Sequence, residues 1–257
     1  MNRVLKLSQN NIINNCFMSD KKKKYFIDNF INIFVFEKEK TKLYFCISDK
    51  NIKKYMHLIE KIFKRIGAMR MIYNNNKYLE VWIYPSRFKK LFPKNNKIHY
   101  DNINSGSTVR LVNSNKNGVI SIWRKEELLK VLLHEILHAF RIDDNYPSPQ
   151  EAHTEFYALL LNIYMTLLEN NKPISKFDKY LAKEKEFSLN QCHKLRNYNP
   201  GNTNANAYFN EKTRLLFDIN EEEWDKYINE NKTSKKYASD NSLRMTISDI
   251  ISKLEIL

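Results

Sequence analysis

The sequence predicts an α+β fold, in which a small, mostly antiparallel sheet packs on one strongly apolar helix and a largely helical C-terminal half follows. Two observations support this prediction. Apolar residues recur mainly with a period of two before residue 124 and with a helical period after it. Strand-like segments therefore come first and most helical segments later, which is the order of an α+β protein.

The length of 257 residues and the hydrophobic fraction of 42% are sufficient for a sizeable core. We assign residues 1–40 to a basic N-terminal extension of uncertain order. Residues 41–257 form a single domain in this interpretation, with a sheet-containing part at 41–140 and a helical part at 141–257. No internal repeat divides the chain further.

Individual elements follow from local patterns. Alternation and β-propensity predict strands at 41–48, 79–84, 107–112 and 118–123. The loop at 113–118 ends in Asn-Gly, which is a strong turn signal. Helical periodicity predicts helices at 51–66 and 125–140, and in the C-terminal half at 149–168, 176–196, 221–230 and 241–256.

The net charge of +14 would ordinarily indicate a partner such as nucleic acid. Here the lysines are scattered over every segment, so we interpret them as a solvated surface, and a nucleic-acid partner stays open without being favoured. The run Lys21-Lys22-Lys23-Lys24 is interpreted in the same way, as a solvated cluster before an aromatic stretch that either pairs with or packs onto the main body.

The cysteines and the apolar segments indicate where the protein resides. Cys16, Cys46 and Cys192 are odd in number and far apart, which supports neither a disulfide framework nor a cysteine-type zinc site. The first 15 residues lack the apolar core of a secretory signal. The apolar stretch 156–168 is shorter than the roughly 20 residues of a membrane span. We therefore expect a cytoplasmic protein with no membrane partner; its oligomeric state does not follow from the sequence.

The chemistry is concentrated in the motif His134-Glu135-Ile136-Leu137-His138. On a helix, residues four apart lie on one face, so both imidazoles can bind one zinc ion. Glu135 is offset by roughly 100° and lies beside the metal, where it can act as general base on a zinc-activated water. A buried carboxylate in such an apolar helix is costly unless it is paired, which favours a site over an ordinary core helix.

The segment from about residue 104 to 164 resembles a zincin metallopeptidase, and its two-motif arrangement resembles the gluzincin group. The string RKEELLKVLLHEILHAF…EAHTEFYA and the composition rich in lysine, asparagine and isoleucine also resemble uncharacterised metallopeptidase-like proteins of large DNA viruses. The first resemblance implies a zincin-like catalytic domain and, through the strand preceding the motif, an edge along which an extended substrate docks. The second implies host cytoplasm or the virion as the location.

The gluzincin resemblance implies a third zinc ligand on the next helix, in an ExxxE pattern. Carried over by position, Glu151 is the ligand, and Glu155 accepts a hydrogen bond from a zinc histidine, His134 in our assignment. An alternative follows from the residues themselves. Ser148-Pro149-Gln150-Glu151 has the form of a capping box, in which Glu151 caps its own helix and Glu155 is the ligand.

The metzincin pattern offers another third ligand, at Asp144. That pattern requires a glycine three residues after the second histidine, where this chain has Arg141, so we rank Asp144 second. His153 projects from another face of its helix and is taken as non-ligating. For the residue that stabilises the oxyanion, Tyr208, Tyr146 and His193 are candidates that nothing in the sequence separates.

The expected function is therefore that of a zinc-dependent metallopeptidase with one catalytic ion, acting on a protein or peptide. Three alternatives remain: a metzincin-like peptidase with Asp144 as a ligand, a zincin-like module that binds zinc without turnover, and a basic nucleic-acid-binding protein in which the motif is coincidental.

Overall fold

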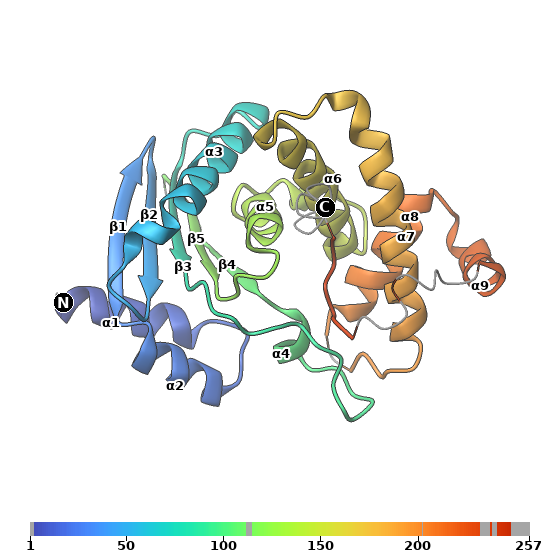
Figure 1. Ribbon diagram of the computed structural model, residues 1–257, viewed down its shortest axis with the longest axis horizontal. Coiled ribbons are helices and arrows are strands. Elements are labelled where there is room, and N and C mark those ends of the chain that lie inside the picture. Colours follow the sequence, from blue (N-terminus) through green and yellow to red (C-terminus); the bar gives the residue numbers. More distant parts are fainter. Residues whose placement is uncertain (1–2, 112–114, 202, 232–236, 238–240, 248–257) are drawn as a thin grey trace. The chain divides into compact units, whose positions relative to one another are not determined.

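The computed structural model describes residues 3–111, 115–201, 203–231, 237 and 241–247 (Figure 1). Within them the chain forms two compact units. The first comprises Met1–Lys89 and Asn104–Ile142, and the second comprises Lys90–Ile103 and Asp143–Leu257. The change of unit at 142/143 lies close to the border predicted at 140/141, but residues 90–103 belong to the second unit.

The first unit contains a five-stranded sheet of order β1-β2-β3-β5-β4. Its strands are β1 (Asn32–Lys38), β2 (Thr41–Ile47), β3 (Tyr78–Ile83), β4 (Gly106–Arg110) and β5 (Lys116–Ile122). The α+β class is confirmed, but the sheet is mixed and not mostly antiparallel. The outer pairs β1–β2 and β4–β5 are antiparallel, whereas β2–β3 and β3–β5 are parallel. A helix connects β2 to β3, and such a crossover permits parallel pairing.

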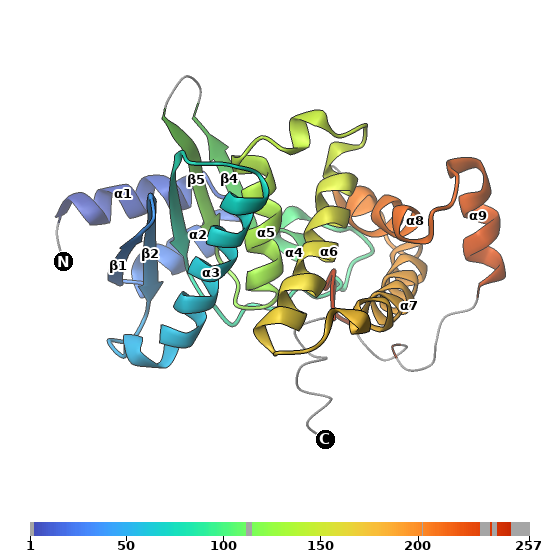
Figure 2. The ribbon, with the colours of Figure 1, turned by 90° about the horizontal axis from the view of Figure 1, so that it is seen from above.

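Helices cover both faces of this sheet (Figures 1 and 2). One face carries α1 (Arg3–Asn14) and α2 (Asp20–Asn29), and the other carries α3 (Met56–Ile72) and α5 (Leu128–Ala139). Central strands that are buried on both faces lose the alternation of polar and apolar residues. This explains the continuous apolar runs in β2 and β3, where Tyr44 stacks on its register partner Trp82 at 4.0 Å between ring centroids.

The N-terminal residues are integrated into the first unit. Residues 32–38, which the sequence analysis assigns to the extension, form β1 and pair along their whole length with β2. The aromatic stretch after the lysine run packs as predicted: Phe26 and Phe30 are buried against Tyr84. Lys21 and Lys24 are exposed.

The Asn117–Gly118 pair lies inside β5, so the turn predicted there is wrong. The register between β3 and β5 shifts between Tyr78 and Leu79, which leaves Asn117 as the extra residue of a β-bulge. Gly118 has a φ of +154°, and a Cβ atom there would lie 2.5 Å from the Val109 carbonyl oxygen. The glycine is required by this close approach. Residues 112–114 of the predicted loop lie outside the described residues.

The second unit is helical in most of its described residues. Its main helices are α4 (Tyr100–Ile103), α6 (Gln150–Glu169), α7 (Phe177–Leu195), a π-helical turn η4 (Ala207–Glu211), α8 (Lys212–Phe217) and α9 (Glu221–Glu230). The helices predicted at 149–168, 176–196 and 221–230 are thus confirmed. In the first unit, the predicted helix 51–66 is present as a short 3-10 turn, η1 (Ile52–Tyr55), that continues into α3.

The helix predicted at 241–256 is not present in residues 241–247, which are irregular apart from an isolated bridge between Ser242 and Leu91. Their backbone groups bond to other parts of the second unit instead of to one another. Leu243 N–H donates to the Lys90 carbonyl, and the buried Gln191 side chain on α7 donates to the carbonyl oxygens of Ser242 and Arg244. Tertiary partners therefore override the helical periodicity here. Residues 248–257 lie outside the described part.

Two further observations concern the location predicted from the sequence. All three cysteines are free thiols in buried positions. Among the described residues, no helix has both the length and the apolar character that a membrane crossing requires.

Candidate metal centre

Helix α5 brings the two motif histidines together. The helix is buried along almost its whole length and packs on β4, β5 and α3. His134 and His138 are one turn apart, and their Nε2 atoms are separated by 3.0 Å. The two rings lie edge to face, with centroids 4.7 Å apart and an interplanar angle of 76°.

The separation of these nitrogens fits shared coordination of a metal ion. Two ligands at 2.0–2.1 Å from a tetrahedral zinc ion are about 3.3–3.4 Å apart, close to the 3.0 Å of the histidine pair. Neutral imidazole nitrogens are common zinc ligands. The spacing and the donor type are therefore both suitable for zinc.

Glu135 is held by the neighbouring strand β4. The Thr108 hydroxyl lies 2.7 Å from Oε2 of the Glu135 carboxylate and 3.0 Å from the Glu135 carbonyl oxygen. Gly106, two residues earlier on the same face of β4, leaves the space that the carboxylate occupies: a Cβ atom at Gly106 would lie 2.6 Å from Oε1. Strand β4 thus both bonds to the buried Glu135 carboxylate and leaves the space that it occupies.

The end of α5 explains how the chain turns where metzincins have glycine. Arg141 adopts a φ of +62°. Its N–H donates to the His138 carbonyl, and Ile142 N–H donates to the Leu137 carbonyl, which together form a Schellman cap. The left-handed turn is therefore made by an arginine, at a cost of about 1–2 kcal/mol. A residue other than glycine was expected to resist this turn, and the two hydrogen bonds of the cap stabilise it at Arg141.

Glu151 lies in the first turn of α6, where the helix N-terminus favours a negative charge. The capping box considered from the sequence is not formed, because Pro149 is the N-cap residue and no side chain caps the helix. The Glu151 carboxylate instead accepts a hydrogen bond from the Tyr208 hydroxyl, at 3.0 Å to Oε2. Both residues belong to the second unit.

His134, His138 and Glu151 form a group that could hold a metal ion. Each offers one ligand atom, and these atoms all lie within 4.8 Å of one another. His134 is buried, and the other two are partly buried. Of the two carboxylates in the ExxxE pattern, the group thus contains Glu151, the one assigned by position.

The remaining predicted residues fall outside this group. Glu155 is buried one turn after Glu151, and Asp144 is exposed in the short turn η2 (Asp143–Asn145). Burial and the nearby Arg214 lower the pKa of His153. His193 bonds through Nε2 to the Asn231 carbonyl at 2.8 Å.

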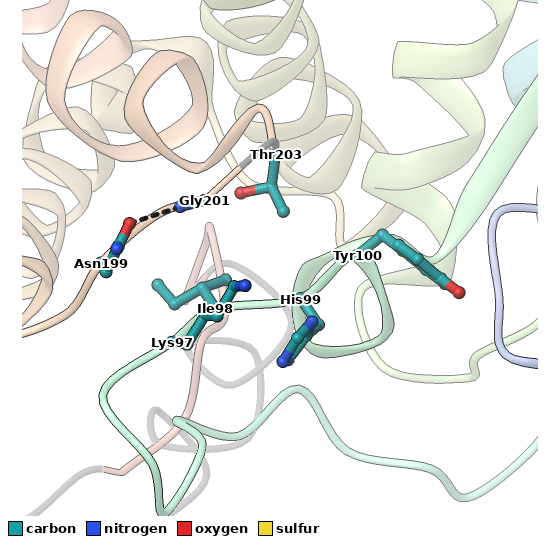
Figure 3. A pocket seen from close by; sticks show the side chains of 7 residues that line it. All are labelled: Lys97, Ile98, His99, Tyr100, Asn199, Gly201 and Thr203. Carbon is teal, nitrogen blue, oxygen red and sulfur yellow. Dashed lines mark hydrogen bonds between the residues drawn. The ribbon is translucent and has the colours of Figure 1, made fainter.

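The second unit also has a pocket of about 570 Å³, which none of the predicted site residues lines (Figure 3). It is lined by residues 97–100 and by Asn199, Gly201 and Thr203. Ile98 N–H donates to the Asn199 carbonyl at 2.8 Å, and Gly201 has a φ of +56°. The walls mix polar side chains, among them Lys97, His99 and Thr203, with the apolar Ile98.

Two residues of the site, Thr108 and Gly106, were missed at the sequence level, and Tyr208 was named there only as a candidate for the oxyanion and not as a partner of Glu151. Thr108 and Gly106 share the face of β4 that meets Glu135, and Tyr208 contacts Glu151 across 57 positions of sequence. The alternation within residues 106–110 is the one signal that could have placed Gly106 and Thr108 on one face. For Tyr208 no pattern links the hydroxyl to Glu151.

No family model, curated protein or solved structure matches this chain.

Proposed function

We propose that this protein is a zinc-dependent peptidase in which His134, His138 and Glu151 bind the metal and Glu135 is the general base. The observation that carries the proposal is the convergence of the three potential ligands to within 4.8 Å, next to a carboxylate fixed by its own hydrogen bond. Two histidines and one glutamate are a ligand set of catalytic zinc sites, which keep a fourth position open.

Zinc bound at this group would act as a Lewis acid that polarises the scissile carbonyl and lowers the pKa of water to about 7. Glu135 accepts a proton from the attacking water as the C–O bond forms. The same carboxylate returns this proton to the leaving amine as the C–N bond breaks. The Thr108 hydroxyl bonds to Oε2 of Glu135 and keeps the carboxylate in one orientation throughout.

The position of β4 supports a peptide as substrate. The zincin resemblance implies that the substrate binds along the strand immediately before the motif, but that strand, β5, is paired on both sides. One edge strand of the sheet is β4, which also carries Thr108. An extended peptide can add to such an edge through main-chain hydrogen bonds. We therefore place the substrate along β4, beside Glu135.

Metal content tests the proposal. Purified wild-type protein is expected to hold one zinc per chain and to cleave members of a broad peptide library, with activity lost to a chelator and restored by zinc. His138→Ala is expected to lose both zinc and cleavage, because two ligands bind the ion too weakly. His153→Ala, a histidine outside the group, serves as the matched control and should behave as wild type.

Two outcomes would favour the alternatives. Stoichiometric zinc without cleavage of any library peptide would indicate a zinc-binding module. A metal-free wild type that binds nucleic acid tightly and in a salt-sensitive manner would indicate a basic nucleic-acid-binding protein.

The glycine in β4 gives a further prediction. Gly106→Ala places a methyl group 2.6 Å from Oε1 and 2.9 Å from Cγ of Glu135, so the carboxylate must move by about 1 Å to reach ordinary contact. A misplacement of this size can lower kcat by about 10²-fold. We expect that loss in a peptide cleavage assay, with zinc content unchanged.

Gly67→Ala is the control for this variant. A Cβ atom at Gly67 meets only the Glu39 carboxylate, at 3.8 Å, so this change should leave kcat at the wild-type value. Equal activity of the two alanine variants would contradict the placement of Glu135.

A further inference from the structure

The turn that carries Tyr208 is a π-helix, in which the bond spans five residues instead of four. Lys212 N–H donates to the Ala207 carbonyl across this wider turn, whereas Tyr208 N–H still makes an α-type bond to the Asn204 carbonyl. Single π-turns inserted into helices are rare and occur frequently at functional sites. This one lies directly before α8.

Buried side chains stabilise the widened turn. The Phe209 carbonyl accepts hydrogen bonds from the Cys192 thiol on α7, at 2.9 Å, and from the Thr213 hydroxyl. Burial raises the pKa of the Cys192 thiol to about 11, so it stays protonated and remains a donor. Two side-chain donors thus satisfy a carbonyl at a turn where the regular α-helical bonding pattern is interrupted. The register of the π-turn is fixed from the interior of the second unit.

This register places the Tyr208 hydroxyl on Glu151. The tyrosine is buried in the hydrophobic cluster of α7 and α9, and its hydroxyl lies 3.0 Å from Oε2 of the carboxylate. The Asn204 side-chain amide, one turn earlier, lies 3.4 Å from the same hydroxyl. A phenol donor on one carboxylate oxygen restricts the rotation of the Glu151 side chain.

We propose that Tyr208 is a positioning residue for the metal, which holds the Glu151 carboxylate in the orientation needed for a ligand. The inference rests on the proposed function, because it assigns Tyr208 a role through Glu151. Outer partners that orient a ligand in this way contribute about 10–100-fold to metal affinity. Tyr208 thereby acts on zinc binding, and not as a group that contacts the substrate.

Zinc affinity, measured by competition with a chromophoric chelator, tests this role. Tyr208→Phe is expected to weaken zinc binding by about 10–100-fold. Tyr198→Phe is the matched control: Tyr198 packs against the same cluster, with its ring 4.6 Å from that of Phe92, and its change should leave the affinity as in wild type. Melting curves in excess chelator establish that both metal-free variants are folded.

A double-mutant cycle separates positioning from a structural effect. If Tyr208 acts through Glu151, Tyr208→Phe has no effect on the weak zinc binding of a Glu151→Ala protein. If Tyr208→Phe fails to fold, Asn204→Ala tests the same hydroxyl, because it removes the amide that contacts the Tyr208 hydroxyl and lies at an exposed position. It should weaken zinc binding by a smaller factor, and again not in the Glu151→Ala background.

Wild-type zinc affinity in both Tyr208→Phe and Asn204→Ala would overturn the inference, as would an equal loss with and without Glu151. A Tyr208→Phe protein with lower kcat and unchanged zinc affinity would also overturn it, since the hydroxyl would then act on the substrate. In each of these cases the proposed peptidase function survives. A wild-type protein that takes up no zinc would contradict both the role of Tyr208 and the proposed peptidase function.

Discussion

Glu135→Gln is expected to lower kcat for peptide cleavage by about 10²–10⁴-fold, the range of a lost general base, while zinc content stays at one ion per chain. The reason is geometric. Gln has the shape of Glu and can still accept the hydrogen bond from the Thr108 hydroxyl, which lies 2.7 Å from Oε2 in the wild type. What it lacks is the ability to take a proton from water at neutral pH.

Metal analysis and steady-state kinetics on one peptide check this expectation. Glu60→Gln is the matched control, because Glu60 is exposed on α3 in an ion pair with Lys64, 3.0 Å away. The control should keep wild-type kcat and zinc content. A Glu135→Gln protein that cleaves as fast as wild type would exclude Glu135 as the base, and one that loses its zinc would show that Glu135 serves the metal instead.

The fold was predictable where the signal is local. The β-propensity of 41–48 and the apolar periodicity of 125–140 each arise from a single element, so β2 and α5 appear close to where they were expected. The sheet order was not predictable in this way. Parallel pairing of β2 with β3 depends on the crossover through α3, and the position of β4 at the edge depends on which strands pair across the unit.

Errors occurred where long-range contacts override local preference. Residues 241–247 have helical periodicity, but the carbonyl oxygens of Ser242 and Arg244 accept hydrogen bonds from the Gln191 side chain. The Asn117–Gly118 pair has the sequence of a tight turn, yet a register shift against β3 makes it a bulge. In both cases the deciding partner lies more than 30 positions away in the sequence, beyond the reach of a window of neighbouring residues.

In the candidate site, too, the local features were predictable and the long-range contacts were not. The spacing of His134 and His138 on one helix was sufficient to predict that their imidazoles meet, and their Nε2 atoms lie 3.0 Å apart. The support around them comes from other elements. Thr108 contacts Glu135 from β4, and Tyr208 contacts Glu151 from the π-turn. Neither contact can therefore be predicted from the sequence of the motif.

Glu151→Gln is expected to weaken zinc binding strongly, because an amide is a much weaker zinc ligand than a carboxylate. The loss of affinity should exceed the factor of about 10–100 that follows from loss of an outer partner. Glu155→Gln is the matched variant, since it makes the same change one turn later on α6. If Glu155 orients a histidine as predicted, its loss should weaken zinc binding by no more than about 10–100-fold. Asp144→Asn, at an exposed position outside the group, should have no effect.

Zinc affinities of the three variants, measured by chelator competition, separate the ligand sets. Loss of zinc from Glu155→Gln alone would make Glu155 the ligand, and loss from Asp144→Asn alone would restore the metzincin-like arrangement. The absence of a capping box at the start of α6 argues for the expected result. With Pro149 at the N-cap and no side chain capping the helix, the Glu151 carboxylate accepts a hydrogen bond from the Tyr208 hydroxyl and lies within 4.8 Å of the histidine nitrogens.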